Sequence, residues 1–206
     1  MAQTEHIGAY LLTIPDGVFP LGGDALALGA FATVRPGWSV CDLGTGSGLL
    51  LFLLSARQSG LTLCGVELDT ASAQAARDNL QQNNLAGDIL TGDLRQQPFP
   101  SGTFDLVVAN PPYFPIHAGK SGGPARSEAF CTLDELCAAA ARLVKNGGRF
   151  AVCHRPERLV DLMCALRAAG LEPKRLKLLS HSPQHPPFAV LVESVRQGGP
   201  GLEIVL

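Results

Sequence analysis

Four consecutive residues, Asn110-Pro111-Pro112-Tyr113, could together bind and orient a planar nitrogen group. They follow an apolar run at 104–109 that is typical of a buried strand. Because proline donates no backbone N–H, the strand must end there and the chain must turn. An amide oxygen, two carbonyls and an aromatic ring then stand at the carboxyl end of a strand, the edge at which open α/β sheets bind ligands. The tetrapeptide therefore predicts an acceptor site for an NH2 group, although a simple rigid turn is the alternative.

A second candidate site is a glycine-rich turn upstream. Residues 38–43 form a short apolar run, Gly44-Thr45-Gly46-Ser47-Gly48 follows, and the apolar run at 49–54 begins a helix. Glycine allows the backbone to approach a ligand closely, so the turn predicts a ligand-cradling loop. A dinucleotide-binding loop needs a further glycine where Leu49 stands, so the spacing argues against NAD.

Acidic residues end the strands that are predicted next to this turn. A strand at 61–67 ends in Glu67, whose carboxylate could accept both hydroxyls of a ribose. A strand at 88–93 ends in Asp93, which could accept from the exocyclic amine of an adenine. With Asp42 and Asn110, four strand ends then carry polar groups at one edge of the sheet. A solvated surface acid is the alternative for Glu67.

Periodicity and helix-breaking residues predict the remaining elements. Helices are expected at 71–82, 132–145 and 156–169, and strands at 149–153, 174–180 and 188–195. Thr70 is the expected cap of the first of these helices, Thr132 and Glu135 form a capping box in the second, and residues 146–148 stop it. The glycine- and proline-rich residues 114–127 predict a long loop beside the acceptor site.

This order of motifs resembles the class I methyltransferases that bind S-adenosylmethionine. Residues 42–48 resemble the first motif of that family, Glu67 its ribose acid, and Gly92-Asp93 its adenine site. Residues 110–113 match the motif of enzymes that methylate amide-like nitrogens in adenine, guanine or glutamine. The resemblance implies a Rossmann-like α/β fold with a seven-stranded, mostly parallel sheet and helices on both faces, and S-adenosyl-L-methionine as the cofactor.

More narrowly, the chain is similar to the bacterial family that forms N6-methyladenine beside the anticodon of a valine tRNA. Residues 24–31 resemble the helix before the first motif, residues 125–128 the stretch after the acceptor motif, and residues 154–159 the segment after the fifth strand. Residues 19–23 depart from the basic entry expected there, and this difference concerns the substrate more than the chemistry.

The resemblance implies a role for each motif residue. The cofactor-binding residues are expected to be Asp42, Gly44, Thr45, Gly46, Gly48, Glu67, Leu68, Asp93, Leu94 and Asn110. The catalytic residues are expected to be Asn110, Pro111, Pro112 and Tyr113. In this hypothesis Asn110 Oδ1 and the Pro111 carbonyl accept hydrogen bonds from the two N–H groups of the target nitrogen, and Tyr113 stacks on the base. Lys120 and Arg126 flank the acceptor loop and are expected to contact phosphate.

Composition favours one globular domain, in which residues 1–37 lead into a core at 38–206. The 206 residues are 46% hydrophobic and 17% charged, which excludes a disordered chain. Residues 1–6 contain no basic signal region, and the longest apolar run, 49–54, is too short to span a bilayer. We therefore expect a cytoplasmic protein with no membrane contact. The six cysteines form no C-x-x-C pair and predict free buried thiols. No metal site is expected, because prolines around His181 and His185 forbid a helix there.

Charge is distributed unevenly along the chain, whose net charge is −2. Residues 1–100 hold four basic and nine acidic side chains, whereas residues 101–206 hold twelve basic and nine acidic ones. A basic second half suits a phosphate backbone, so tRNA is the expected partner and no obligate protein partner is expected. Ordinary solubilising charges are the alternative.

Other functions fit some of the same motifs. A protein-glutamine or rRNA-guanine methyltransferase would use the same acceptors, but the glutamine enzymes of this kind carry an additional N-terminal helical domain. The stretch before Trp38 is too short for that domain. A non-catalytic cofactor-binding module is a third possibility, which the intact motif at 110–113 disfavours.

Overall fold

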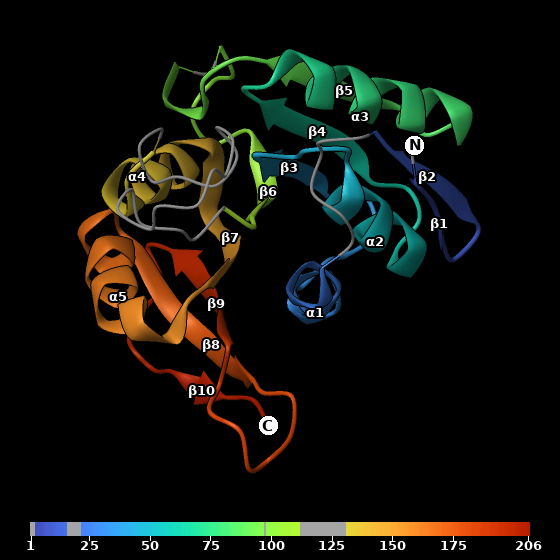
Figure 1. Cartoon of the computed structure of the whole chain (residues 1–206). Coiled ribbons are helices and arrows are strands. Elements are labelled where there is room, and N and C mark those ends of the chain that lie inside the picture. The colour runs from blue at the N-terminus through green and yellow to red at the C-terminus, as the bar shows by residue number, and fades with distance from the viewer. Residues whose placement is uncertain (1–2, 16–21, 97, 112–130) are drawn as a thin grey trace.

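A mostly parallel sheet forms the centre of the structure, a computed structural model that describes residues 3–15, 22–96, 98–111 and 131–206 (Figure 1). Within these ranges the sheet has eight strands, in the order β10-β8-β9-β7-β6-β3-β4-β5. The strands are β3 (Ser39–Leu43), β4 (Thr62–Glu67), β5 (Gly87–Thr91), β6 (Phe104–Ala109), β7 (Val144–His154), β8 (Leu171–Leu179), β9 (Ala189–Arg196) and β10 (Glu203–Ile204). The helices are α1 (Gly23–Phe31), α2 (Leu49–Arg57), α3 (Thr70–Gln82), α4 (Leu133–Leu143) and α5 (Leu159–Ala168), with short 3-10 turns η1 (Leu94–Gln96) and η3 (Pro156–Arg158).

The strand order creates a switch point between β3 and β6. The strands β5, β4, β3, β6 and β7 are parallel, and the chain runs outward from β3 through β4 to β5 before it returns to β6. Strand β9 is antiparallel to both β7 and β8. Ligands of open α/β sheets bind at such a switch point, beyond the carboxyl ends of the strands. The connections after β3 and after β6 therefore lie at the expected ligand-binding edge of the sheet.

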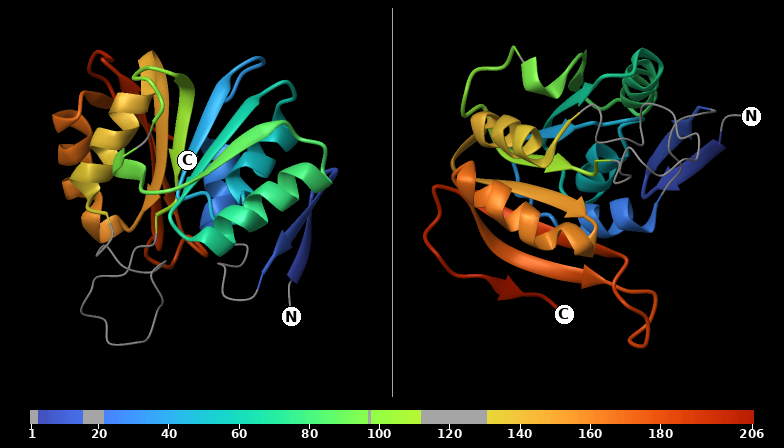
Figure 2. Two further views of the ribbon diagram at one scale, coloured as in Figure 1. Left: turned by 90° about the horizontal axis from the view of Figure 1, so that it is seen from above. Right: turned by 60° about the vertical axis from the view of Figure 1, so that its left-hand side comes forward.

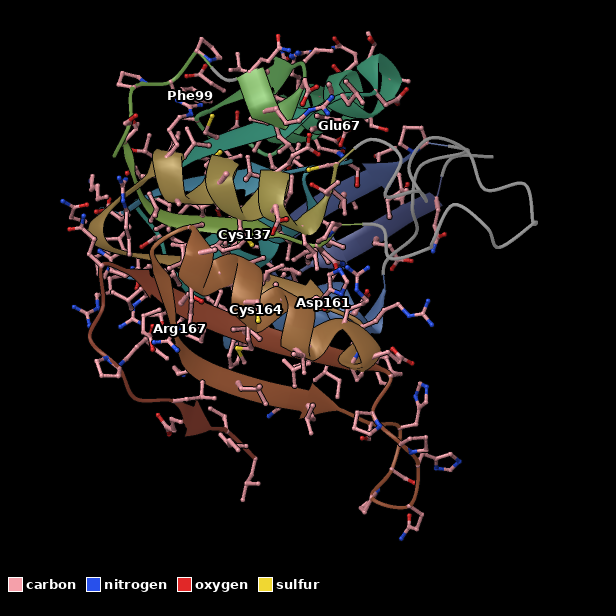
Figure 3. The ribbon with its side chains drawn as sticks, turned by 90° about the vertical axis from the view of Figure 1, so that its left-hand side faces the viewer. Glu67, Phe99, Cys137, Asp161, Cys164 and Arg167 are labelled. Carbon is pink, nitrogen blue, oxygen red and sulfur yellow. The ribbon has the colours of Figure 1, made fainter. Side chains whose placement is uncertain are left out.

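Helices cover both faces of the sheet, which confirms the predicted Rossmann-like architecture (Figure 2). One apolar cluster joins α1, α2 and α3 to one face, and a second joins α4 and α5 to the other. Figure 3 shows α4 and α5 side by side, with Cys137 on the first and Cys164 on the second. Strand β10, two residues long, adds an eighth strand to the seven that were expected. No helix in the described ranges is long and apolar enough to cross a bilayer.

An antiparallel hairpin near the N-terminus was not expected from the sequence. Strands β1 (Gln3–Ile7) and β2 (Tyr10–Ile14) pair with each other. Two asparagines fix the hairpin: Asn79 in α3 bonds the backbone N–H and C=O of Thr13, and Asn83, the C-cap of α3, bonds those of Leu11. A strand whose backbone partners are side chains of a distant helix has no local sequence signature.

Three local expectations need correction, and one is confirmed. Asp69, not Thr70, caps α3, because its carboxylate accepts from the Ser72 backbone N–H at 2.8 Å. Helix α4 ends at Leu143, and residues 146–148 lie within β7, which pairs with β6 through a register shift. The capping box of Thr132 and Glu135 is confirmed. The strand cysteines are buried and free as expected, but Cys131 is half-buried and Cys164 is exposed.

Candidate functional site

The glycine turn after β3 needs glycine at alternate positions. Gly44, Gly46 and Gly48 have φ values of 78°, 55° and 92°, a conformation that residues with a Cβ rarely adopt. The turn is fixed to β4, because the backbone N–H groups of Gly44 and Thr45 both donate to the carbonyl of Val66, at 2.8 and 3.0 Å. The loop therefore has a defined shape at the switch point, with Gly48 as the N-cap of α2.

Glu67 connects this loop to the end of β4. One carboxylate oxygen, Oε2, accepts from the Gly46 N–H at 2.9 Å, and Oε1 accepts from the Asp69 N–H at 2.9 Å. Each oxygen keeps a second lone pair, so the carboxylate can still accept hydroxyl donors. Glu67 is half-buried, and Figure 3 shows it at the end of the molecule where β4 leads into α3.

Asp42 is a buried carboxyl group close to this loop. Burial raises the pKa of Asp42 to about 7; the nearby Thr45 hydroxyl opposes the shift, and the negative charge of Glu67 adds to it. Asp42 Oδ1 and Thr45 Oγ1 are buried, and neither has a partner among the described residues in normal hydrogen-bond geometry, although the Thr45 hydroxyl lies near enough to the Asp42 carboxyl to affect its pKa. Buried polar atoms are normally paired, so these two mark a place where a ligand would supply donors and acceptors.

Gly65 supports the loop and was not identified from the sequence. It lies within β4, and a Cβ at this position would come within 2.8 Å of the Thr45 Cγ2 and 2.7 Å of the Ile89 Cδ1. The Thr45 methyl group thus packs directly on the bare backbone of β4. An isolated glycine inside an apolar strand is the sequence signal that indicates such a close approach.

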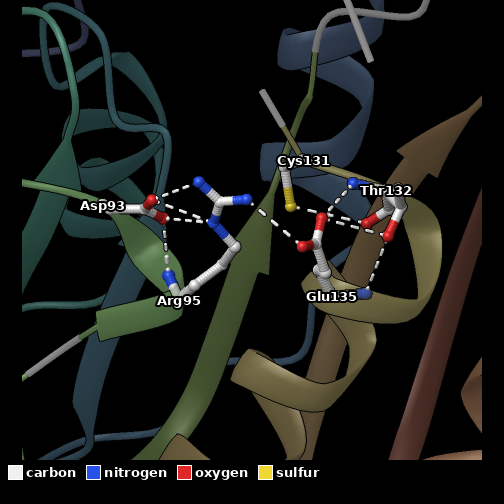
Figure 4. A network of polar contacts seen from close by, with 5 residues as sticks. All are labelled: Asp93, Arg95, Cys131, Thr132 and Glu135. Carbon is white, nitrogen blue, oxygen red and sulfur yellow. Dashed lines mark hydrogen bonds and ion pairs between the residues drawn. The ribbon is translucent and has the colours of Figure 1, made fainter. Parts of the chain in front are cut away.

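Asp93 is not an isolated acceptor, because Arg95 binds it through both carboxylate oxygens (Figure 4). The backbone N–H of Arg95 also donates to Asp93 Oδ1, at 2.9 Å. These hydrogen bonds from Arg95 hold the pKa of the Asp93 carboxyl below its usual range. The same guanidinium reaches Glu135 at 3.2 Å, and so it bridges Asp93 to the capped N-terminus of α4.

The acceptor motif begins where β6 ends. Asn110 and Pro111 directly follow Ala109, the last residue of β6, so they lie beside the glycine turn that follows β3. Asn110 is half-buried, and its Nδ2 donates to Asp24 Oδ2 at 3.4 Å. Pro112, Tyr113, Lys120 and Arg126 lie outside the described residues, so their predicted roles stay predictions.

Leu68 and Leu94, the two apolar residues expected to bind the cofactor, have different surroundings. Leu68 is 51% exposed at the end of β4, and Leu94 is half-buried in η1, where it packs against the apolar cluster of α4 and α5. In the described ranges no group of three or more His, Cys, Asp or Glu side chains is arranged to hold a metal ion. The site is therefore built from backbone amides, carboxylates and one amide side chain.

Solved structures with the same fold include several methyltransferases. A predicted O-methyltransferase from Agrobacterium tumefaciens superposes with a TM-score of 0.72 at 19% identity, covering 88% of this chain and 84% of that one. Geranyl diphosphate C-methyltransferase from Streptomyces coelicolor, solved with S-adenosyl-L-homocysteine, gives 0.64 at 15% identity, covering 84% and 78%. Fold and site together define a class I methyltransferase that uses S-adenosylmethionine.

The chain belongs to the methyltransferase small domain family, whose sequence model matches residues 23–166. A relative from Porphyromonas gingivalis, named tRNA1(Val) (adenine(37)-N6)-methyltransferase, is 32% identical over 187 residues, which cover 84% of this chain and 73% of the relative. A protein of the same name from Cronobacter sakazakii is 37% identical over 144 residues, covering 64% of this chain and 57% of that protein. The family predicted from the sequence is confirmed.

Proposed function

We propose that this protein transfers a methyl group from S-adenosylmethionine to N6 of an adenine in a tRNA, beside the anticodon. The observation that carries the proposal is the position of Asn110 at the end of β6, next to the glycine loop that follows β3. The names of the relatives from Porphyromonas gingivalis and Cronobacter sakazakii support the choice of adenine in a tRNA.

The residues around the glycine loop fit this cofactor. Glu67 retains lone pairs for ribose hydroxyls after it has bonded Gly46 and Asp69. Asp42 Oδ1 and Thr45 Oγ1 are buried and unsatisfied among the described residues, and an ionised Asp42 suits a ligand that carries positive charge. Asp93, whose carboxylate Arg95 orients, is the proposed acceptor for the adenine amine.

Catalysis needs few protein groups. When bound, S-adenosylmethionine supplies a sulfonium methyl group that is already activated. The adenine amine is a poor nucleophile, because its lone pair is delocalised into the ring. Asn110 Oδ1 and the Pro111 carbonyl would accept hydrogen bonds from its two N–H groups. These hydrogen bonds favour a pyramidal nitrogen with a freer lone pair, and they are strongest in the transition state. The methyl group would pass from the sulfonium to this nitrogen, S-adenosylhomocysteine would remain, and the extra proton would leave to solvent.

The rest of the proposal concerns the substrate and the setting. Tyr113 would stack on the target base, which is cheapest to unstack in a loop. Lys120 and Arg126, in the basic half of the chain, would contact the phosphate backbone. We place this activity in a single catalytic domain of a cytoplasmic protein.

Methyl transfer from labelled S-adenosylmethionine tests the proposal directly. The substrates are an unmodified valine tRNA transcript, the same transcript with guanine at the target position, an rRNA fraction and a protein fraction, followed by mass spectrometry of the products. N6-methyladenosine in the unsubstituted tRNA alone is expected. Methyl label in guanine or in glutamine would show that the substrate is not an adenine. Tight binding of S-adenosylhomocysteine without any methyl transfer would indicate a binding module.

A further inference from the structure

We propose that Asp24 is a positioning residue that sets the orientation of the Asn110 amide, so that the Asn110 oxygen faces the target nitrogen. The inference rests on the proposed function and goes beyond it, because the motif residues to which the sequence assigned roles do not include Asp24. It belongs to the first turn of α1, 86 residues before Asn110 in the sequence.

The chemistry of the contact determines which way the amide points. An ionised carboxylate only accepts hydrogen bonds, and of the two groups at the end of an asparagine side chain only the NH2 group donates. Asp24 Oδ2 therefore selects the rotamer in which Nδ2 faces α1, and Oδ1 is turned away from it. An amide in the opposite orientation would bring two acceptors together at Asp24 and present a donor to the substrate amine.

The contact between Asn110 and Asp24 is long in the protein without substrate. At 3.4 Å it is longer than the usual N–H···O separation of about 2.9–3.0 Å. Catalytic hydrogen bonds are often long before substrate binds and shorten in the reacting complex. Asp24 Oδ1 accepts from the backbone N–H of Ala25 at 2.9 Å, which fixes the carboxylate that Asn110 contacts.

Helix α1 is a rigid support for Asp24, because its far end is anchored to the sheet. The Arg57 guanidinium donates to the carbonyls of Gly29 and Ala32, and Arg175 donates to that of Phe31 at 3.1 Å. Glu193, fully buried in β9, accepts from the backbone N–H of Thr33 just beyond the helix, at 2.6 Å. A positioning group is effective only when its own support is fixed.

Two adjacent glycines provide a matched test. A Cβ at Gly22, the N-cap of α1, would overlap Asp24 Oδ1, and the flexible carboxylate is the group that would move. A Cβ at Gly23 would meet nothing within 4 Å. Neither glycine has a positive φ, so alanine strains the backbone at neither position. Gly22→Ala therefore displaces the Asp24 carboxylate without removing it, and Gly23→Ala is its control.

The experiment compares Asp24→Ala, Gly22→Ala and Gly23→Ala in single-turnover methylation of tRNA, with cofactor affinity and Tm measured on each variant. We expect Asp24→Ala to slow methyl transfer about tenfold, the lower end for a charge-assisted hydrogen bond. Gly22→Ala should slow it several-fold, and Gly23→Ala should leave it unchanged. Cofactor affinity should stay within about twofold, and Asp24→Asn, which keeps an acceptor oxygen, should recover part of the rate.

A double-mutant cycle separates positioning from a structural role. If Asp24 acts through Asn110, Asp24→Ala should slow transfer no further in an Asn110→Ala background. An equal additional loss in that background, or a normal rate in Asp24→Ala while Asn110→Ala is inactive, would overturn the inference and leave the proposed function standing. A normal rate in Asn110→Ala would instead remove the acceptor hypothesis itself, and the role of Asp24 with it.

The NMR spectrum of Asn110 gives a second test of the contact, and this test does not depend on turnover. The side-chain NH2 resonances of Asn110, assigned by their loss in Asn110→Ala, should shift in Asp24→Ala and Gly22→Ala but not in Gly23→Ala. Unmoved resonances would overturn the contact whatever substrate the protein methylates.

Discussion

The two sides of the switch point are built differently. Beyond β3 and β4, the glycine loop and Glu67 are joined by hydrogen bonds between neighbouring strands, and most donors are backbone N–H groups. Beyond β6, Asn110 contacts a side chain of α1 that is distant in the sequence. The cofactor side is therefore preorganised by its own motif, whereas the acceptor side depends on a tertiary contact. Substitutions on the first side should alter binding, and substitutions on the second should alter turnover.

The largest expected effect is that of Asn110→Ala. The Asn110 oxygen matters most as the target nitrogen becomes pyramidal, so single-turnover methylation should fall about a hundredfold or more, the scale of one lost electrostatic contact. Cofactor affinity, titrated in parallel, should stay within a few-fold. A comparable loss of affinity would show that the two sides of the site are not separate.

Glu67→Ala should produce the opposite pattern. It removes an acceptor for ribose hydroxyls and also the partner of the Gly46 N–H, so the affinity for S-adenosylhomocysteine should fall about tenfold to a hundredfold, from the roughly 1.5–3 kcal/mol of charge-assisted hydrogen bonds. Calorimetry measures this, and Glu67→Gln, which keeps one acceptor oxygen, should lose less. Unchanged affinity in a folded variant would reduce Glu67 to a surface acid.

The buried carboxyl of Asp42 gives the cofactor side a pH dependence. With a pKa of about 7, Asp42 is mostly protonated at pH 6 and mostly ionised at pH 8. If the ionised form binds the positively charged cofactor, affinity should rise about tenfold over this interval, because the ionised fraction of Asp42 rises about tenfold between pH 6 and pH 8. In Asp42→Asn the dependence should be lost. An identical pH profile in wild type and variant would assign the dependence to another group.

The same group predicts how stability changes with pH in the absence of ligand. The pKa is raised from 3.8 to about 7 on folding, so between these values the folded chain binds more protons than the unfolded chain. The free energy of unfolding should therefore decrease as pH rises from about 4 to about 7. Denaturant titrations of wild type against Asp42→Asn should show this slope only in the wild type, and S-adenosylhomocysteine should reduce it.

The smallest effect is expected for Arg95→Ala, which tests whether the two sides communicate. Arg95 orients Asp93 and also contacts Glu135 in the first turn of α4, but it is exposed, so solvent screens both ion pairs and weakens their contribution. Cofactor affinity should fall by roughly threefold, and Glu135→Gln should change it less. A larger effect of Arg95→Ala on turnover than on affinity would extend the acceptor side to α4.

The sequence predicted well what depends on neighbouring residues. Alternate glycines after an apolar run indicated a turn with positive φ, and the prolines after Ala109 indicated where β6 ends, because glycine and proline act on their own backbone. Glu67, at the end of β4, was placed by strand periodicity in the same way. The roles of these residues in binding and catalysis stay predictions.

Pairings between distant elements were decided only by the tertiary structure. The contact of Asp24 with Asn110, the bridge from Asp93 through Arg95 to Glu135, and the hairpin held by α3 each join residues that no local pattern connects. Their side chains are individually ordinary: an acid in a first turn, an arginine after a strand, an asparagine within a helix. Asp24 and Asn110 meet because the fold brings the first turn of α1 to the end of β6, and a polar group gains such a partner only if the fold supplies it.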